Sequence, residues 1–214
     1  MSNSFVILES YNVTMDFKII NRFDKDRFQV EEFIKNKYQQ IFNAKVEKFP
    51  GILVTIFDKN DVKAACGLRT ELDGFFSQLY LSDDIEDIIH SYFPDSKKPK
   101  ILEIVNLVSN SPLASLKMTK ELNKFCLDKS YQYAFFTATK PLVKFLNHTG
   151  LDLIKIGKAD INKVSNSSYW GSYYENDPQV FFARVPELTF SILFKNLRKN
   201  FTNVEFSKLA NQAL

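Results

Sequence analysis

Two apolar segments joined by a short polar turn constrain the fold of this chain more than any other feature. Residues 51–57 read Gly-Ile-Leu-Val-Thr-Ile-Phe, and a second apolar run at 62–69 follows the polar residues 58–61. Two such runs around a short turn are typical of an antiparallel hairpin. The sequence therefore predicts a pair of neighbouring strands over residues 51–69.

Further strands are expected downstream. The run Ile-Leu-Glu-Ile-Val-Asn-Leu-Val at 101–108 is apolar enough to predict an inner strand, covered on both faces. Shorter apolar runs predict strands at 133–137, 151–156 and 179–185. Residues 75–81 are expected to form a third strand or an extended segment.

Apolar residues at helical spacing predict helices around these strands. The first is expected at 28–42, with Asp26 as a candidate cap, and an acidic second one at 83–89. Pro112 is suited to the first turn of a third helix, and a fourth is expected to begin at Lys140. Helices therefore alternate with strands in the second half of the chain.

This order of elements predicts the fold class. Antiparallel strands followed by strand-helix alternation indicate a mixed α/β sheet with helices on both faces. The order matches the acyl-CoA N-acyltransferase (GNAT)-like fold, which acyl-homoserine-lactone synthases share. At 214 residues the chain suits one main domain. We expect that domain at 27–187, after an N-terminal extension (1–26) and before a C-terminal amphipathic helical segment (188–214).

Charge and composition exclude several classes of protein. The chain has 28 basic and 25 acidic residues, which is too balanced for a nucleic-acid-binding face. It lacks an apolar run of about 18 residues and a secretory signal, so we expect a cytoplasmic protein. Cys66 and Cys126 are expected to be reduced and buried. The two histidines have no metal-ligand spacing, and no metal site is expected.

Several motifs resemble those of a known bacterial family. Residues 136–142 (FTATKPL) and 170–180 (WGSYYENDPQV) resemble the FTATxxL and WGSYYxxxPxV signatures of the thermostable hemolysins. Residues 66–69 (CGLR) and 103–107 (EIVNL) resemble that family's G-[YL]-R and EVGNL segments. The motifs occur in the family's order, and the resemblance extends roughly from Arg27 to Arg184.

The chain departs from the family pattern at a few positions. The family's LFLEQYL segment corresponds to 75–81 (FFSQLYL), so Gln78 replaces a glutamate and Leu79 a glutamine. Val105 replaces the glycine of EVGNL. Any role of those family positions does not carry over to this chain.

The resemblance also implies where substrates would bind. The family is similar in layout to acyl-homoserine-lactone synthases, which have an arginine on an early helix, an arginine at a strand end and a glutamate on the next long strand. By that similarity Arg27, Arg69 and Glu103 would face the substrate cleft. Asn106, in the EIVNL segment, is a further candidate for substrate binding.

Glu103 lies on an otherwise apolar strand, and two roles stay open for it. Burial would raise its pKa and make it a general base for an attacking amine. Pairing with Arg69 would lower its pKa and make it structural. Arg69 and Glu103 are both candidate catalytic residues.

Polar and aromatic residues near strand ends are the remaining candidates. Thr137 and Thr139 end a strand where ligands gather in α/β sheets, although Thr139 is better suited to capping the next helix. Tyr173 is a candidate acid for a leaving thiolate, and Trp170 and Tyr174 are candidates for substrate binding. The alternative for these three rings is an aromatic clamp that packs a loop.

The acyl donor is not determined by these motifs. Residues 109–115, where a helix start would receive phosphates, contain no glycine-rich loop and no arginine. Coenzyme A binding is therefore not indicated by motif. Acyl-CoA, the pantetheine of an acyl-carrier protein, or no donor at all stay open.

Three functions compete. The first is an acyltransferase that moves a fatty acyl group to a small amine. The sequence contains 21 phenylalanines, and a phenylalanine-rich interior could house the acyl chain. The second is a membrane-acting hemolysin, in which the basic amphipathic segment after 188 would make peripheral membrane contact. The third is a non-catalytic ligand-binding module of the same fold.

Overall fold

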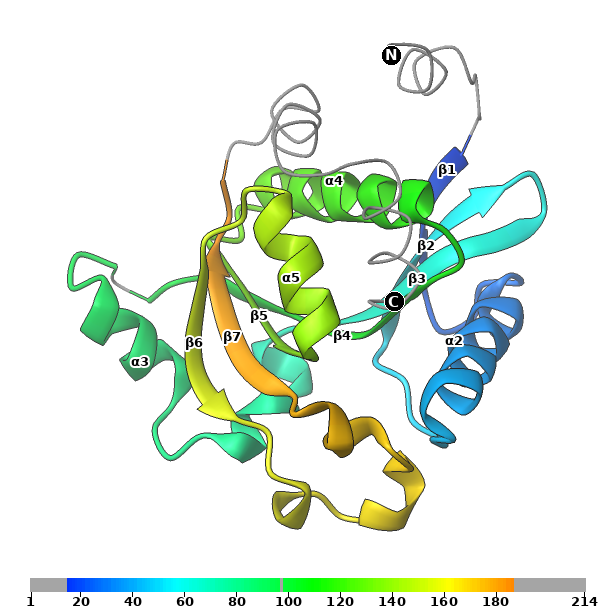
Figure 1. Ribbon diagram of the computed structural model, residues 1–214. Helices are drawn as coiled ribbons and strands as arrows, with labels where there is room; N and C mark the ends of the chain where they lie inside the picture. Colours follow the sequence, from blue (N-terminus) through cyan, green and yellow to red (C-terminus); the bar gives the residue numbers. More distant parts are fainter. Residues whose placement is uncertain (1–14, 97, 187–214) are drawn as a thin grey trace, which may run out of the picture.

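The protein forms one mixed sheet flanked by helices. The computed structural model describes residues 15–96 and 98–186. Seven strands lie in the order β1-β2-β3-β4-β5-β7-β6 (Figure 1). Neighbouring strands are antiparallel except β4 and β5, which are parallel. The strands are β1 (Met15–Ile20), β2 (Ile52–Asp58), β3 (Asp61–Arg69), β4 (Ile101–Ser109), β5 (Tyr133–Ala138), β6 (Leu153–Lys158) and β7 (Gln179–Arg184).

Helices cover both faces of the sheet. The α-helices are α2 (Arg27–Phe42), α3 (Ile85–Tyr92), α4 (Pro112–Asp128) and α5 (Lys140–His148). α2 packs on one face of β2 and β3, and α4 packs on the opposite face of the same strands. α5 lies on the α4 side and α3 on the α2 side (Figure 1). The predicted mixed α/β architecture is confirmed.

Short 3₁₀-helices form the connections that border the site. They are η1 (Glu71–Asp73), η2 (Ser77–Tyr80), η3 (Ile161–Lys163), η4 (Ser167–Trp170) and η5 (Tyr173–Asn176). The strand or extended segment expected at 75–81 is wrong, because η2 occupies residues 77–80 of it. Its backbone is bent by hydrogen bonds to a distant side chain, as described below. Conversely, β1 forms antiparallel pairs with β2 in a segment where no strand is predicted.

Two residues predicted as helix caps occupy the N-cap positions, but their side chains make no capping hydrogen bonds. Asp26 occupies the N-cap position of α2, yet its carboxylate makes no capping hydrogen bond and instead pairs with Lys18. Thr139 occupies the N-cap position of α5, where Pro141 stands in the first turn, and its side chain makes no capping hydrogen bond either. The fixed φ of the proline favours the helix start.

The core contains most of the apolar strand residues. Leu53, Ile56 and Leu68 are fully buried in the hairpin, and Phe135 and Phe182 are fully buried in the other half of the sheet. Cys66 and Cys126 are free and buried, as predicted. None of the helices in the described residues is long and apolar enough to cross a membrane. The predicted C-terminal amphipathic helix lies outside the described residues.

Candidate functional site

The parallel strands β4 and β5 pair only at their beginnings. Ile101, Leu102 and Glu103 pair with residues 133–135, and beyond these positions no further pairs join the two strands in the described part of the chain. Each strand keeps its other neighbour, β3 for β4 and β7 for β5. The facing edges therefore diverge and leave backbone N–H and C=O groups without a strand partner.

A cavity of about 350 Å³ occupies this divergence. It is lined by both diverging edges, including Asn106 on β4 and Thr137 on β5. On one side it reaches the apolar residues of α4 and α5, such as Leu122 and Leu146. On the other side it is bordered by α2, η2 and the loop that carries Trp170. The cavity thus passes through the sheet, with an apolar part and a more polar part.

Asn106 bends β4 at the wall of the cavity. Its φ is +54°, a left-handed conformation that asparagine tolerates better than most residues. The register with β3 shifts at the same place, since Ala65 pairs with Val108 and Gly67 with Val105. Tyr38 on α2 makes a side-chain hydrogen bond with Asn106. The bulge lies on the cavity wall, because Val105, Asn106 and Leu107 all line the cavity.

Glu103 lies at the point where the strands separate. Its side chain is fully buried, and its two carboxylate oxygens accept hydrogen bonds of 2.6 Å from the backbone amides of Phe76 and Ser77. The Nε atom of Arg69 is 3.6 Å from Oε2. These contacts hold η2 against the sheet, which explains why 75–81 does not extend as a strand.

The two roles that the sequence leaves open for Glu103 act together. Burial raises the pKa of Glu103, whereas hydrogen bonds from Ser77 and Phe76 and the charge of Arg69 lower it, and the net direction is upward. Cavity and carboxylate are adjacent, because Arg69, Phe76 and Ser77 border the cavity while Glu103 lies behind them. A ligand in the cavity would meet these residues before it met the carboxylate.

Arg69 is fastened to the turn that follows its own strand. Its Nε donates to the carbonyl of Gly74 and one terminal nitrogen to the carbonyl of Asp73, both at 2.7 Å. Its side chain is partly exposed and lies on the rim of the cavity. Arg69 therefore braces η1 and carries a positive charge beside Glu103.

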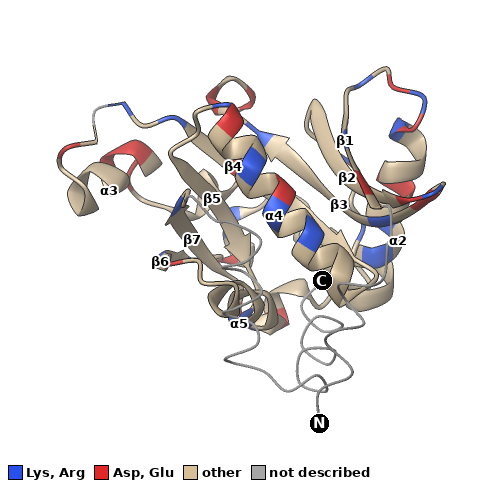
Figure 2. Cartoon of the chain, turned by 90° about the horizontal axis from the view of Figure 1, so that it is seen from above, with Lys and Arg blue, Asp and Glu red and all other residues tan. Residues whose placement is uncertain are grey.

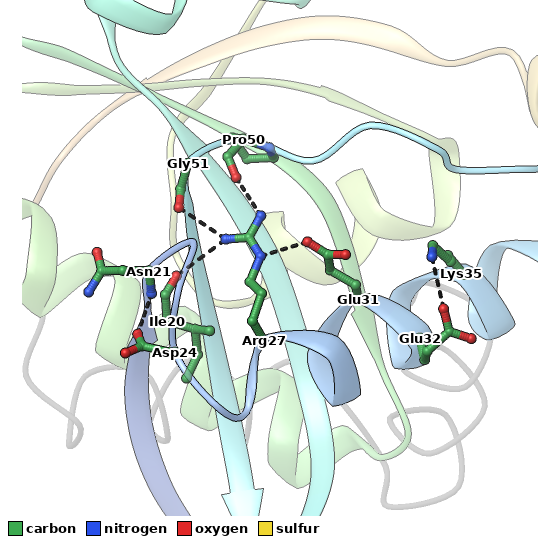
Figure 3. Close-up of polar contacts among 9 residues, drawn as sticks. All are labelled: Ile20, Asn21, Asp24, Arg27, Glu31, Glu32, Lys35, Pro50 and Gly51. Atoms are coloured by element: carbon green, nitrogen blue, oxygen red, sulfur yellow. Dashed lines mark hydrogen bonds and ion pairs between the residues drawn. The ribbon is translucent and has the colours of Figure 1, made fainter.

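Arg27 does not border the cavity. Its guanidinium donates to the carbonyls of Pro50 at 2.7 Å and Gly51 at 3.0 Å, and its Nε pairs with Glu31 at 2.6 Å (Figure 3). The contact with Ile20 is longer, at 3.5 Å. These bonds tie the start of α2 to the ends of β1 and of the segment before β2. The geometry gives Arg27 a structural position.

Two hydroxyls connect η2 with β5. The Ser77 and Thr137 hydroxyl oxygens are 2.8 Å apart, and both residues line the cavity. Thr139 also lines it, at the end of β5. The sequence pattern singles out the threonines but not Ser77, because its contact with Thr137 spans 60 residues.

Four tyrosines form a phenol cluster on the α2 side. The Tyr80 and Tyr174 hydroxyls are 2.5 Å apart, and the Tyr173 ring packs edge-on against Tyr174. Burial is the largest cause that raises the pKa of Tyr38, Tyr80, Tyr173 and Tyr174. These phenols stay protonated at neutral pH and can donate to a ligand. Tyr38 and Tyr80 are site residues that the sequence pattern does not reveal.

The loop with Trp170 is clamped onto the end of α2. Ser172 N donates to the carbonyl of Phe42 at 2.8 Å, and Lys45 N to the carbonyl of Tyr169 at 2.6 Å. Gly171, at φ +47°, lies so close that a Cβ atom there would be 2.0 Å from the Phe42 oxygen. The aromatic motif is therefore packed as a clamp, one of the two roles that the sequence leaves open. The rings of Trp170 and Tyr173 also line the cavity, whereas Tyr174, a predicted substrate-binding residue, does not.

The side chain of Gln78 has a structural role. Its Nε2 donates to the carbonyl of Asp83 and its Oε1 accepts from the amide of Ile85, both at 2.9 Å. A side chain with both a donor and an acceptor is needed for this pair of contacts. Gln78 thereby joins η2 to the start of α3.

The start of α4 is capped by neighbouring hydroxyls. Ser111 Oγ accepts from the amide of Ala114, and Ser109 Oγ accepts from the amide of Ser111, both at 3.2 Å. Basic and acidic residues are interspersed along α4 (Figure 2), and Lys117 pairs with Glu121. In this part of the protein no separate glycine cradle for a diphosphate is present between 109 and 115.

Comparison with solved structures identifies the fold. The AHL synthase LasI has a TM-score of 0.57 at 14% identity, covering 85% of this chain and 95% of that chain. FeeM, an N-acyl amino acid synthase from uncultured soil microbes, has a TM-score of 0.56 at 12% identity, covering 82% and 94%. The CoA-dependent acyl-homoserine lactone synthase MesI has a TM-score of 0.56 at 11% identity, covering 87% and 97%. The chain has the GNAT-like fold of these synthases.

Sequence comparison identifies the family. No curated protein matches the sequence. The family model of thermostable hemolysins matches residues 20–188, which is most of the chain and includes every motif discussed above. The chain belongs to the thermostable hemolysin family.

Proposed function

We propose that this protein is an acyltransferase that moves a fatty acyl group from a thioester to a small amine, with residues 27–187 as the catalytic domain. The observation that carries the proposal is the cavity that crosses the sheet between the diverging edges of β4 and β5. It joins an apolar compartment to a polar one, as a reaction between a fatty chain and an amine requires.

The apolar compartment suits the acyl chain. It is lined by side chains from α4, α5, β5 and β7, among them Leu122, Leu142, Leu146 and Ala134. Each methylene moved from water into such surroundings stabilises a complex by about 0.8 kcal/mol. A fatty chain is therefore a better occupant than an acetyl group.

The diverging edges suit a pantetheine arm. Pantetheine contains amide groups, and an extended ligand can add hydrogen bonds to free strand edges. A solved structure of the CoA-dependent acyl-homoserine lactone synthase BjaI, which has a similar fold, contains SAM and isopentyl-CoA. Both acyl-CoA and an acyl-carrier protein carry this arm, and the capped start of α4 favours the carrier protein, because it offers no glycine cradle for a diphosphate.

The residues around the divergence would support aminolysis of the thioester. Backbone amides at the Asn106 bulge would polarise the thioester carbonyl. The protonated phenol of Tyr173, which lines the cavity, would donate to the departing thiolate or to the head group of the amine. Trp170 would close the compartment on the side of α2.

Thiol release tests the proposal. Purified protein is incubated with acyl-carrier-protein and acyl-CoA donors of increasing chain length and a panel of small amines. The free thiol is measured with a thiol-reactive dye, and the acylated amine by mass spectrometry. Because both cysteines of the protein are buried, they add little background. Binding of a donor in calorimetry without thiol release would instead make the protein a ligand-binding module.

A cavity-filling variant provides the matched control. Ala134→Leu adds bulk to the apolar compartment from the β5 side. It should leave short donors unaffected and weaken long ones, by about fourfold for each methylene excluded. Equal effects on short and long donors would contradict the assignment of this compartment.

A further inference from the structure

The Ser77 hydroxyl lies between a buried carboxylate and a residue of the cavity wall. The Ser77 amide is 2.6 Å from Oε1 of Glu103, and its hydroxyl oxygen is 2.8 Å from that of Thr137. Ser77 is 1% exposed and Glu103 is fully buried, whereas Thr137 is only half-buried and faces the cavity. Glu103 therefore lies deepest, and Ser77 joins it to Thr137 through its amide on one side and its hydroxyl on the other.

The direction of each hydrogen bond between these side chains depends on where each hydroxyl directs its single proton. A hydroxyl has one proton to donate. The Ser77 hydroxyl makes a side-chain hydrogen bond with Glu103, which has only acceptor oxygens when ionised. Either hydroxyl can donate in the Ser77–Thr137 bond, and when the Ser77 proton is directed to Glu103 the Thr137 hydroxyl donates to Ser77. This leaves the lone pairs of the Thr137 oxygen directed away from Ser77 and available to a ligand.

We propose that Thr137 and Ser77 form a two-hydroxyl proton relay from the cavity to Glu103. The inference rests on the proposed function, because it assigns the path that the proton of the acyl-accepting amine follows. Direct transfer to Glu103 is obstructed, since the Phe76 and Ser77 amides and the Arg69 guanidinium surround the carboxylate. The hydroxyl chain bypasses this obstruction.

The chemical step balances in atoms and protons. The amine nitrogen forms a bond to the thioester carbonyl carbon and becomes strongly acidic as it gains positive charge. Its proton passes to the Thr137 oxygen, the Thr137 proton passes to Ser77, and the Ser77 proton passes to Glu103. The carbon–sulfur bond then breaks, and the electron pair leaves with the thiolate. The proton held by Glu103 returns along the same hydroxyls to yield the free thiol and the starting enzyme.

The surroundings of Glu103 favour this role. Burial raises its pKa, which makes the carboxylate a stronger base than an exposed glutamate. The positive charge of Arg69, 3.6 Å from Oε2, favours the ionised form and opposes the effect of burial. A hydroxyl relay of this kind needs no movement of the carboxylate, whose position is fixed by two backbone amides.

The test compares threonine variants that differ by one hydroxyl. Thr137→Val removes the hydroxyl at nearly constant volume, and Thr137→Ser keeps it. We expect Thr137→Val to lower kcat by about 100-fold or more, within the range of general base catalysis, with KM for the donor changed by less than about threefold. Thr137→Ser should restore most of the rate. Thr55→Val is the control, because Thr55 is a buried strand threonine whose hydroxyl bonds to Ala64 and does not line the cavity.

The pH profile separates a relay from a structural role. In the wild type kcat should fall as the pH drops through the pKa of Glu103, which lies above that of an ordinary glutamate. In Thr137→Val this limb should disappear. A folded Thr137→Val protein with the wild-type kcat and pH profile would overturn the relay.

A second measurement needs no turnover. The pKa of Glu103 is followed by ¹³C NMR of glutamate-labelled protein, with the resonance assigned through Glu103→Gln. Ser77→Ala should raise this pKa, because it removes a hydrogen bond that lowers it. An unchanged pKa overturns the relay. If no donor releases thiol but the pKa rises, the acyltransferase proposal fails while the link between Ser77 and Glu103 stands.

Discussion

Replacing Gly171 by alanine should detach the aromatic loop from α2. A Cβ atom at this position would be 2.0 Å from the Phe42 oxygen and 2.7 Å from the Asn43 oxygen. Both are backbone atoms, so no side-chain rotation relieves the contact. The backbone must move, and the hydrogen bond from Ser172 to Phe42 must lengthen or break.

The magnitude follows from these contacts. Holding a non-glycine residue at φ +47° and ψ −129° costs about 1–3 kcal/mol. Loss of the Ser172 bond and of the Lys45 bond to Tyr169 costs about 1 kcal/mol each. We therefore expect Gly171→Ala to lower the free energy of unfolding by about 3–5 kcal/mol, a large fraction of the stability of a typical domain.

Gly74→Ala is the matched control. Gly74 also has a positive φ, +66°, but a Cβ atom there would meet nothing within 4 Å. This variant isolates the conformational cost from the steric one and should lose only about 1–2 kcal/mol. The difference between the two variants measures the contact with α2.

Urea unfolding provides the assay. Trp170 is the sole tryptophan and lies beside Gly171, so its fluorescence reports on the loop, while far-UV circular dichroism reports on the whole sheet and helices. In Gly171→Ala the fluorescence transition should move to lower urea more than the circular dichroism transition does. Equal stability of Gly171→Ala and Gly74→Ala would refute the packing argument.

Three further predictions concern buried polar groups. Arg27→Ala should lower the free energy of unfolding by about 3–5 kcal/mol, because it leaves the carbonyls of Pro50 and Gly51 unsatisfied. Calorimetry at a temperature where the variant is folded should show unchanged affinity for the acyl donor. Glu103→Gln should lower the free energy of unfolding by about 1–3 kcal/mol, because two backbone amides then face one amide oxygen and one NH₂ group. A higher stability of the variant in chemical denaturation at pH 7 would disprove this. Burial raises the pKa of Cys126 to about 12, so the folded protein should react with iodoacetamide at pH 8 far more slowly than the urea-unfolded protein, and equal rates would contradict the packing of α4.

The stability contributed by Glu103 should depend on pH in a defined sense. Its folded-state pKa is raised by burial, so the folded state holds the proton more tightly than the unfolded state. Its contribution is therefore most favourable below the unfolded pKa and is lost as the pH rises through the folded pKa. Wild-type and Glu103→Gln denaturation at several pH values should diverge in that window, and parallel curves would contradict the shift.

The sequence predicts most of the sheet because its inner strands are continuous apolar runs. The apolar runs at 101–108 and 133–137 predict strands, and the observed strands each extend one residue further, to Ser109 and Ala138. Residues 75–81 have the same apolar character but fold as η2, because their backbone amides bond to a carboxylate about 27 residues away. No local pattern encodes that bond.

The candidate site is predicted in part. Glu103, Arg69 and Thr137 are recognisable because polar residues stand out at strand ends. Arg27 is singled out by family layout, but its partners are backbone carbonyls, which any sequence can supply. Ser77 escapes notice because a lone serine in an aromatic segment acquires meaning only through residues that the fold brings beside it.

The short pairing of β4 with β5 has a mechanical consequence. The two halves of the sheet, β1–β4 and β5–β7, share a main-chain seam of three residue pairs, and Glu103 is the last residue of that seam on β4. We expect such a seam to act as a hinge point, about which small rotations would widen or narrow the opposite end while each half stays intact. Amide hydrogen exchange along this line should therefore be faster than in the β2–β3 hairpin, and a bound acyl chain, by bridging the halves, should slow it.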